Sequence, residues 1–157
     1  MIFKNVELYN VAELIENEKG YDMLRVPESV ERHMSEKGQP RNRYSSGTEI
    51  RFVCLGDEVK IKLCTKTADF LFVYVYYGSI PAGWQECRKI ITKDSEIVVS
   101  KPNDMDKLKK ISEENGFPFD PNVVRIIMPN SPCTIIDVEG DCRPPKAEEV
   151  PQKTYLA

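Results

Sequence analysis

The sequence predicts a mostly β fold, an antiparallel β-sandwich of jelly-roll type with one or two short helices. Short apolar runs fill the chain from residue 49 onward, and Gly, Pro, Asn or Asp separates them. Many short strands interrupted by turn residues are typical of sandwiches and barrels. Only two segments carry helical patterns, and a chain of 157 residues is long enough to bury roughly 70% of its unfolded surface as one domain.

Two helices are expected at the edges of this sandwich. The first follows Pro27 in PESVERHMSEKG and ends near Gly38, because proline suits the first position of a helix and glycine the position after its end. The second lies in NDMDKLKKISEENG, where Asn103 is placed to cap its start and Gly116 to end it.

The clearest strand signal is TEIRFVCLGDEVKIKLC, residues 48–64. A β-hairpin that turns at Gly56-Asp57 places six apolar side chains on one face and the charged side chains on the other, since strand residues alternate sides. In that register the opposed pairs are Cys54 with Val59, Phe52 with Ile61, and Ile50 with Leu63. Further strands are expected over residues 70–78, 87–92, 96–100, 122–129 and 133–140.

The strand FLFVYVYYG, residues 70–78, is apolar on both faces. Alternation gives one face of Phe70, Phe72, Tyr74 and Tyr76, and another of Leu71, Val73, Val75 and Tyr77. A sandwich strand with two apolar faces needs a cover on its outer side. We expect a second domain to cover the face that carries Leu71, Val73, Val75 and Tyr77; a helix of the same chain or a second copy fits the pattern equally.

Charge and cysteine content limit the partners and the compartment. The net charge of −3 argues against nucleic acid or an anionic membrane as a partner, since both attract clustered positive charge. The five cysteines are odd in number and form no C-x-x-C pair, so neither a metal site nor a disulfide framework is predicted. Free thiols and the lack of a secretory signal pattern indicate a cytoplasmic protein.

No residue pattern predicts catalysis or a cofactor. His33 is the only histidine, and it lies in a charged helical segment without a nucleophile elbow nearby. The acidic residues show no spacing that singles out a catalytic pair, and the chain has no phosphate-binding glycine loop. We therefore expect a chain that is not itself an enzyme.

Aromatic side chains are the remaining candidates for binding, namely Tyr74, Tyr76, Tyr77 and Trp84. Flat side chains with a polar tip suit stacking on sugar rings. The alternative is structural: the tyrosines fill the core or face a partner domain, and Trp84 covers the edge of the sandwich.

The C-terminal third of the chain resembles part of a known family. The stretch PFDPNVVRIIMP, followed by IIDVEGDCRPPKAEEVPQKTYLA, is similar to the segment that leads into the catalytic domain of two-domain SGNH (GDSL-type) hydrolases. These include carbohydrate-esterase family 2 and related bacterial acylhydrolases, in which a β-sandwich precedes the esterase domain. YSSGTEIRF with DEVKIKL also resembles the first long hairpin of that sandwich.

This resemblance implies an accessory domain over residues 1–140, followed over residues 141–157 by a linker and the first strand residues of an absent hydrolase domain. The blocks that carry the family's serine, oxyanion-hole and histidine residues have no counterpart here, so no catalytic residue is carried over. The implied partner is an SGNH hydrolase domain of the same polypeptide, which would hydrolyse acetyl or carbohydrate esters. The alternative is an independent carbohydrate-binding module.

Overall fold

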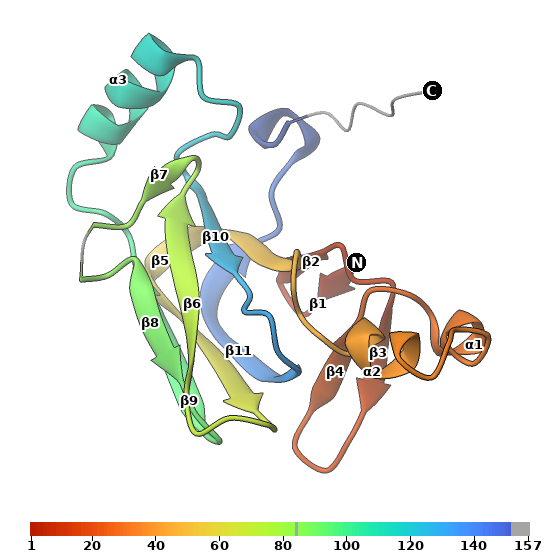
Figure 1. The fold of residues 1–157 in the computed structure, drawn as a ribbon. Coiled ribbons are helices and arrows are strands. Elements are labelled where there is room, and N and C mark those ends of the chain that lie inside the picture. The colour runs from red at the N-terminus through yellow and green to blue at the C-terminus, as the bar shows by residue number, and fades with distance from the viewer. Residues whose placement is uncertain (84, 152–157) are drawn as a thin grey trace, which may run out of the picture.

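Eleven strands form one continuous antiparallel hydrogen-bonded network in the computed structural model, which describes residues 1–83 and 85–151 (Figure 1). The strands are β1 (Ile2–Phe3), β2 (Val6–Tyr9), β3 (Glu13–Glu16), β4 (Tyr21–Leu24), β5 (Glu49–Thr65), β6 (Leu71–Tyr77), β7 (Ile80–Pro81), β8 (Arg88–Ile91), β9 (Ser95–Ser100), β10 (Val123–Ile127) and β11 (Cys133–Arg143). The helices are α1 (Glu28–Glu31), α2 (Gly38–Asn42) and α3 (Met105–Asn115), with a 3-10 turn η1 (Ala147–Glu149). The predicted fold class is confirmed, with three short α-helices where one or two were expected.

The long strand β5 belongs to both layers of the sandwich. Its first half, Glu49–Val53, pairs with β10 on one edge and with β2 on the other. Its second half pairs with β9 and β11. One layer therefore contains β8, β6, β10, β5 and β2, with β7 on β6 and β1 on β2, and the other contains β9, β5, β11, β4 and β3.

The predicted hairpin at Gly56-Asp57 is wrong, because β5 continues through these residues as one strand. Phe52 pairs with Val124 of β10, and Cys54 pairs with Cys142 of β11. The two halves of β5 therefore bond to other strands instead of bonding to each other, as they would in a hairpin. All six apolar side chains of the predicted face are nonetheless buried: Ile50, Phe52, Cys54, Val59, Ile61 and Leu63. A bend that shifts the alternation by one residue turns both halves of β5 toward the core, as a hairpin would have done.

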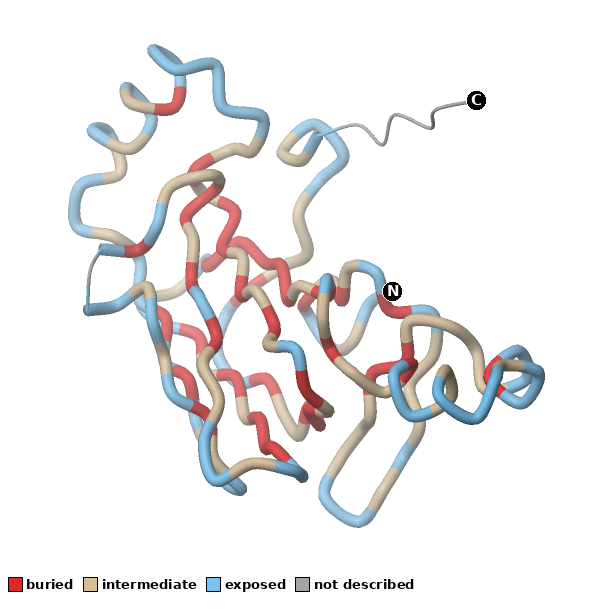
Figure 2. Tube along the Cα trace, viewed as in Figure 1, coloured by how far each residue is buried: buried red, intermediate tan, exposed pale blue. Residues whose placement is uncertain are grey.

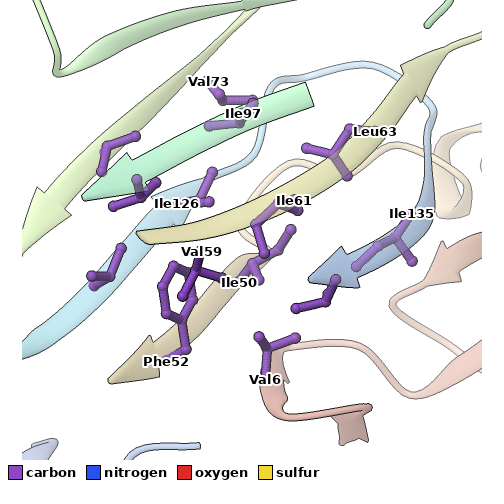
Figure 3. Close-up of a cluster of buried hydrophobic side chains, with 14 of the residues drawn as sticks. Val6, Ile50, Phe52, Val59, Ile61, Leu63, Val73, Ile97, Ile126 and Ile135 are labelled. Carbon is purple, nitrogen blue, oxygen red and sulfur yellow. The ribbon is translucent and has the colours of Figure 1, made fainter. Parts of the chain in front are cut away.

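Side chains from both layers meet in one core (Figure 3). Phe52, Ile126 and Val73 come from one layer, and Ile61 and Ile97 from the other, and all five are almost completely buried. Figure 2 shows that the strands alternate between buried and more exposed residues, whereas the helices are mostly exposed. The strands, and not the helices, therefore hold this fold together.

The helices differ in how well the sequence predicted them. The segment after Pro27 forms two short helices, and Gly38 begins the second instead of ending the first. In α3 the Asp104 side chain, not Asn103, accepts the capping hydrogen bond, which comes from the Lys107 backbone N–H. Gly116 ends α3 in the left-handed conformation, with φ of 61°. Strands β1 to β4, which precede the first predicted helix, were not predicted.

The C-terminal segment follows directly from β11. This strand extends to Arg143, three residues beyond the predicted boundary at Gly140. The Arg143 guanidinium then pairs with the Glu149 carboxylate across the turn, where Arg143 Nη1 donates to Glu149 Oε2 at 2.7 Å. The backbone N–H of Asp120 also donates to the Glu149 carbonyl at 2.9 Å, which places η1 beside the loop before β10. The expected strand at Tyr155, Leu156 and Ala157 lies outside the described residues.

Candidate functional site

The two faces of β6 have different environments. Val73, Val75 and Tyr77 point into the core and are buried. Tyr74 on the opposite face is 43% exposed, and Phe70, just before β6, is 56% exposed. The face with Leu71, Val73, Val75 and Tyr77 is thus covered within the chain, and the expectation of a second domain over it is wrong. The opposite face is the outer one, and it remains open.

An apolar surface lies on this outer face, and we call Phe70, Phe72, Tyr74 and Ile90 the outer patch. Phe72 is paired with Ile90 across β6 and β8, which places both side chains on one face. The rings of Phe70 and Phe72 meet edge to face, with centroids 5.5 Å apart. The guanidinium carbon of Arg88 lies 3.5 Å from the centroid of the Phe72 ring, an arrangement typical of cation–π contacts. Ile90 itself is 57% exposed.

Charged side chains continue the same face on the neighbouring strands. Arg125 forms a two-bonded pair with Glu49, with Nε to Oε2 at 2.8 Å and Nη2 to Oε1 at 2.7 Å. Arg51 Nε donates to the same carboxylate at 2.8 Å. The ring of Phe119 covers both guanidinium groups, with its centroid 4.0 Å from Arg125 Cζ and 5.2 Å from Arg51 Cζ.

This charged cluster is partly removed from water, which affects the Glu49 carboxyl. Burial by itself raises the pKa of Glu49, but hydrogen bonds from Arg125 and Arg51 and their positive charges outweigh it, so the pKa lies below its ordinary value. The carboxylate stays ionised and bonded to both arginines. The cluster joins β5 to β10 and holds the Phe119 loop against the sheet.

The structure separates the four aromatic residues that the sequence singled out. Tyr74 and Tyr76 are on the outer face of β6, where Tyr76 is half-buried and paired with Arg125. Tyr77 is on the inner face, and its hydroxyl donates to the Ser100 carbonyl at 2.6 Å. Trp84 lies outside the described residues. Sequence reasoning missed Ile90, although the alternation of Ile90 with the buried Ile91 in CRKIIT is a signal for an outward side chain.

Tyr77 borders a groove of about 660 Å³ between β6, β9 and α3. Val75, Val99 and Leu108 contribute apolar surface to it, and Lys89 and Lys107 contribute charge. Burial raises the pKa of Tyr77 to about 12, so the hydroxyl remains a donor at neutral pH. Through its hydrogen bond to Ser100, Tyr77 ties the end of β6 to β9 beside this groove.

The other sequence candidates can also be placed. His33 is exposed on the turn after α1, where its backbone N–H donates to the Val30 carbonyl. Within residues 1–83 and 85–151, no three His, Cys, Asp or Glu side chains gather closely enough to hold a metal ion. Over the same residues, no helix is long and apolar enough to span a membrane.

Comparison with known proteins finds similarity in structure only. No protein-family model and no curated protein matches the sequence. A solved structure, the salicylyl-acyltransferase SsfX3 from a tetracycline biosynthetic pathway, superposes on this chain with a TM-score of 0.63 and 11% identity. The fold matches part of an acyltransferase. The match covers 92% of this chain but only 40% of that one, so most of the longer chain has no counterpart here, and at this identity the likeness shows the fold alone.

Proposed function

We propose that this chain is a non-catalytic accessory domain that packs beside an acyl-transferring domain of the SGNH (GDSL) type in the same polypeptide. The observation that carries the proposal is the structural match, in which nearly the whole chain corresponds to two fifths of a salicylyl-acyltransferase chain. The C-terminal stretch that resembles the entry to an SGNH hydrolase domain supports the same arrangement.

Ester hydrolysis and acyl transfer share one chemical step, which links the hydrolase resemblance with the acyltransferase match. A serine takes the acyl group from an ester, and an oxyanion hole stabilises the tetrahedral intermediate. Water or an alcohol then accepts the acyl group. The accessory domain supplies no reacting group in this scheme; it positions the second domain and shapes the access of a substrate, for which acetylated carbohydrate is our first candidate.

The outer face is the surface that we assign to the partner domain. The chain reaches this face at η1, because the Glu149 carbonyl accepts from Asp120 and the neighbouring Phe119 covers Arg51 and Arg125. A domain that follows η1 is therefore tethered at the edge of the outer face. From Tyr76, the partner of Arg125, the outer patch begins two residues away at Tyr74 and ends six residues away at Phe70. Six residues of extended strand span roughly 20 Å, which is within the width of one domain.

The test begins with the coding sequence after Ala157 and continues in the full polypeptide. We expect a serine-bearing block soon after this codon, and a stop codon there would overturn the single-chain arrangement. In the two-domain protein, Ile90→Ser should weaken the interface and speed proteolysis of the 144–151 segment roughly tenfold, because one apolar contact is lost. Val98→Ser is the matched control, since Val98 is also an exposed aliphatic residue on a strand but belongs to β9 in the other layer. Equal proteolysis of both variants would contradict the assigned surface.

An independent carbohydrate-binding module is the second candidate, favoured by the exposed rings of Tyr74 and Phe70 on a sheet face. Aromatic rings in such positions stack on sugars. A glycan array probed with this chain distinguishes the two functions. Our proposal predicts no binding, whereas binding that Tyr74→Ala abolishes would establish the binding module instead.

A further inference from the structure

Two of the five cysteines face each other across adjacent strands. Cys54 of β5 and Cys142 of β11 are direct partners in the antiparallel register. Direct partners in such a ladder have Cα atoms about 4.5–5.5 Å apart, within the range of about 4.4–6.8 Å that a disulfide requires. Both side chains belong to the same core cluster, so they also point to the same face.

The geometry points to Cys54 and Cys142 as a reversible disulfide site. The pair lies at a margin of the core, because the next residues along each strand, Leu55 and Asp141, are exposed. In the reduced state each thiol donates to a backbone carbonyl, Cys54 to Gly56 at 3.3 Å and Cys142 to Asn5 at 3.6 Å. This inference does not depend on the proposed accessory role.

A second pair of nearby cysteines shows why position in the ladder matters. Cys133 is the partner of Thr65, and Cys64 is the partner of Thr134, so the two cysteines are offset by one residue. Neighbouring strand positions point to opposite faces, and a disulfide between Cys64 and Cys133 is therefore excluded by direction. This pair is a matched control that is buried in the same two strands.

The oxidant is a small-molecule disulfide such as oxidised glutathione. A thiolate of the pair attacks the glutathione disulfide, forms a mixed disulfide and releases one glutathione thiolate. The thiolate of the second cysteine then attacks the sulfur of the first cysteine in this mixed disulfide, which forms the Cys54–Cys142 bond and releases the other glutathione thiolate. Two protein thiols are oxidised, one disulfide is reduced to two glutathione molecules, and the two thiol protons pass to them.

Burial controls the rate of this exchange. Burial raises the pKa of the Cys54 thiol, although the Lys101 charge opposes it, and burial also raises the pKa of Cys142. Few thiolates are present at neutral pH, so exchange is slow there and accelerates as the pH rises.

The disulfide would fasten the end of β11 to β5 immediately before the C-terminal segment. It closes the long loop spanning residues 54–142, and cross-links that close long loops stabilise by restricting the unfolded chain. We expect the midpoint of thermal unfolding to rise by roughly 10 °C on oxidation and to return on reduction with dithiothreitol.

The test uses the native full chain incubated with oxidised glutathione, followed by alkylation of the remaining thiols and peptide mapping. The expected product is a peptide that joins Cys54 to Cys142, together with the rise in unfolding temperature. Cys54→Ser and Cys142→Ser should each abolish both signals, while Cys64→Ser and Cys133→Ser should retain them.

Peptide mapping of the unsubstituted chain decides the matter even if a serine variant does not fold. Alkylation of both Cys54 and Cys142 after oxidation would overturn the inference. So would a bond between Cys64 and Cys133, a bond between two chains, or glutathione attached to the less buried Cys87 alone.

Discussion

Glu49 illustrates how one side chain stabilises the outer face. Its carboxylate binds Arg51 and Arg125 at once, and its side chain is only 14% exposed. Removing it leaves two partly buried guanidinium groups, and Arg51 then faces the more distant Glu7 carboxylate, whose Oε2 lies 3.7 Å from Arg51 Nη1. The loss of an acid from a buried ion pair is costly because the remaining charge stays desolvated.

We expect Glu49→Gln to lower the free energy of unfolding by about 3 kcal/mol at pH 7. The pKa of Glu49 is lowered on folding, so its contribution is fully present above the unfolded pKa of about 4.3 and is lost as the pH falls below it. Urea unfolding between pH 3 and pH 7 should therefore show a smaller difference between variant and parent at the acidic end. Glu58→Gln is the control, since Glu58 is half exposed and its change should stay within about 0.5 kcal/mol. Equal effects of the two substitutions would contradict this account.

At the level of elements, β11 depends on a glycine where its register with β5 shifts. Gly140 has φ of 108°, and a Cβ there would lie 2.6 Å from the Glu58 carbonyl oxygen. Gly116 at the end of α3 also has a positive φ, of 61°, but a Cβ there meets no atom within 4 Å. A side chain at either position would carry the energetic cost of a positive φ, but only at Gly140 would it also clash with the neighbouring strand.

Gly140→Ala should thus destabilise the protein by about 3 kcal/mol, and Gly116→Ala by about 1 kcal/mol. Chemical denaturation of both variants measures the difference. Comparable losses would show that β11 relaxes around the added methyl group.

The sequence predicted well which strand residues point inward, because the alternation of apolar and polar residues shows this directly. It predicted poorly which strands pair with one another, because alternation does not identify the partner. The six inward residues of β5 were identified, yet their hydrogen-bond partners were not, because a bend and a hairpin give the same alternation. Likewise, the two faces of β6 were separated from the sequence, but which face is outer depends on the strands beside it. The outer patch needs Ile90 of β8, which sequence spacing alone does not bring next to Phe72.

For the whole molecule, the segment after β11 is peripheral. The turn η1 contains no buried residue and is fixed mainly by the Arg143–Glu149 pair and the Asp120 hydrogen bond. Deleting residues 144–157 should lower the midpoint of thermal unfolding by only about 3 °C, because partly exposed contacts of this kind are worth about 1 kcal/mol. Differential scanning calorimetry checks this value. A much larger drop would mean that the segment is part of the sandwich.

The bend in β5 also determines how the protein unfolds. Because β5 is one continuous strand that belongs to both layers, neither layer can unfold without breaking the hydrogen bonds between β5 and its partner strands in the other layer. Amide hydrogens at Ile50 and Leu63, on opposite sides of the bend, should therefore exchange with solvent only through a shared opening, with equal free energies. Native-state hydrogen exchange that released one half before the other would reveal two separate folding units.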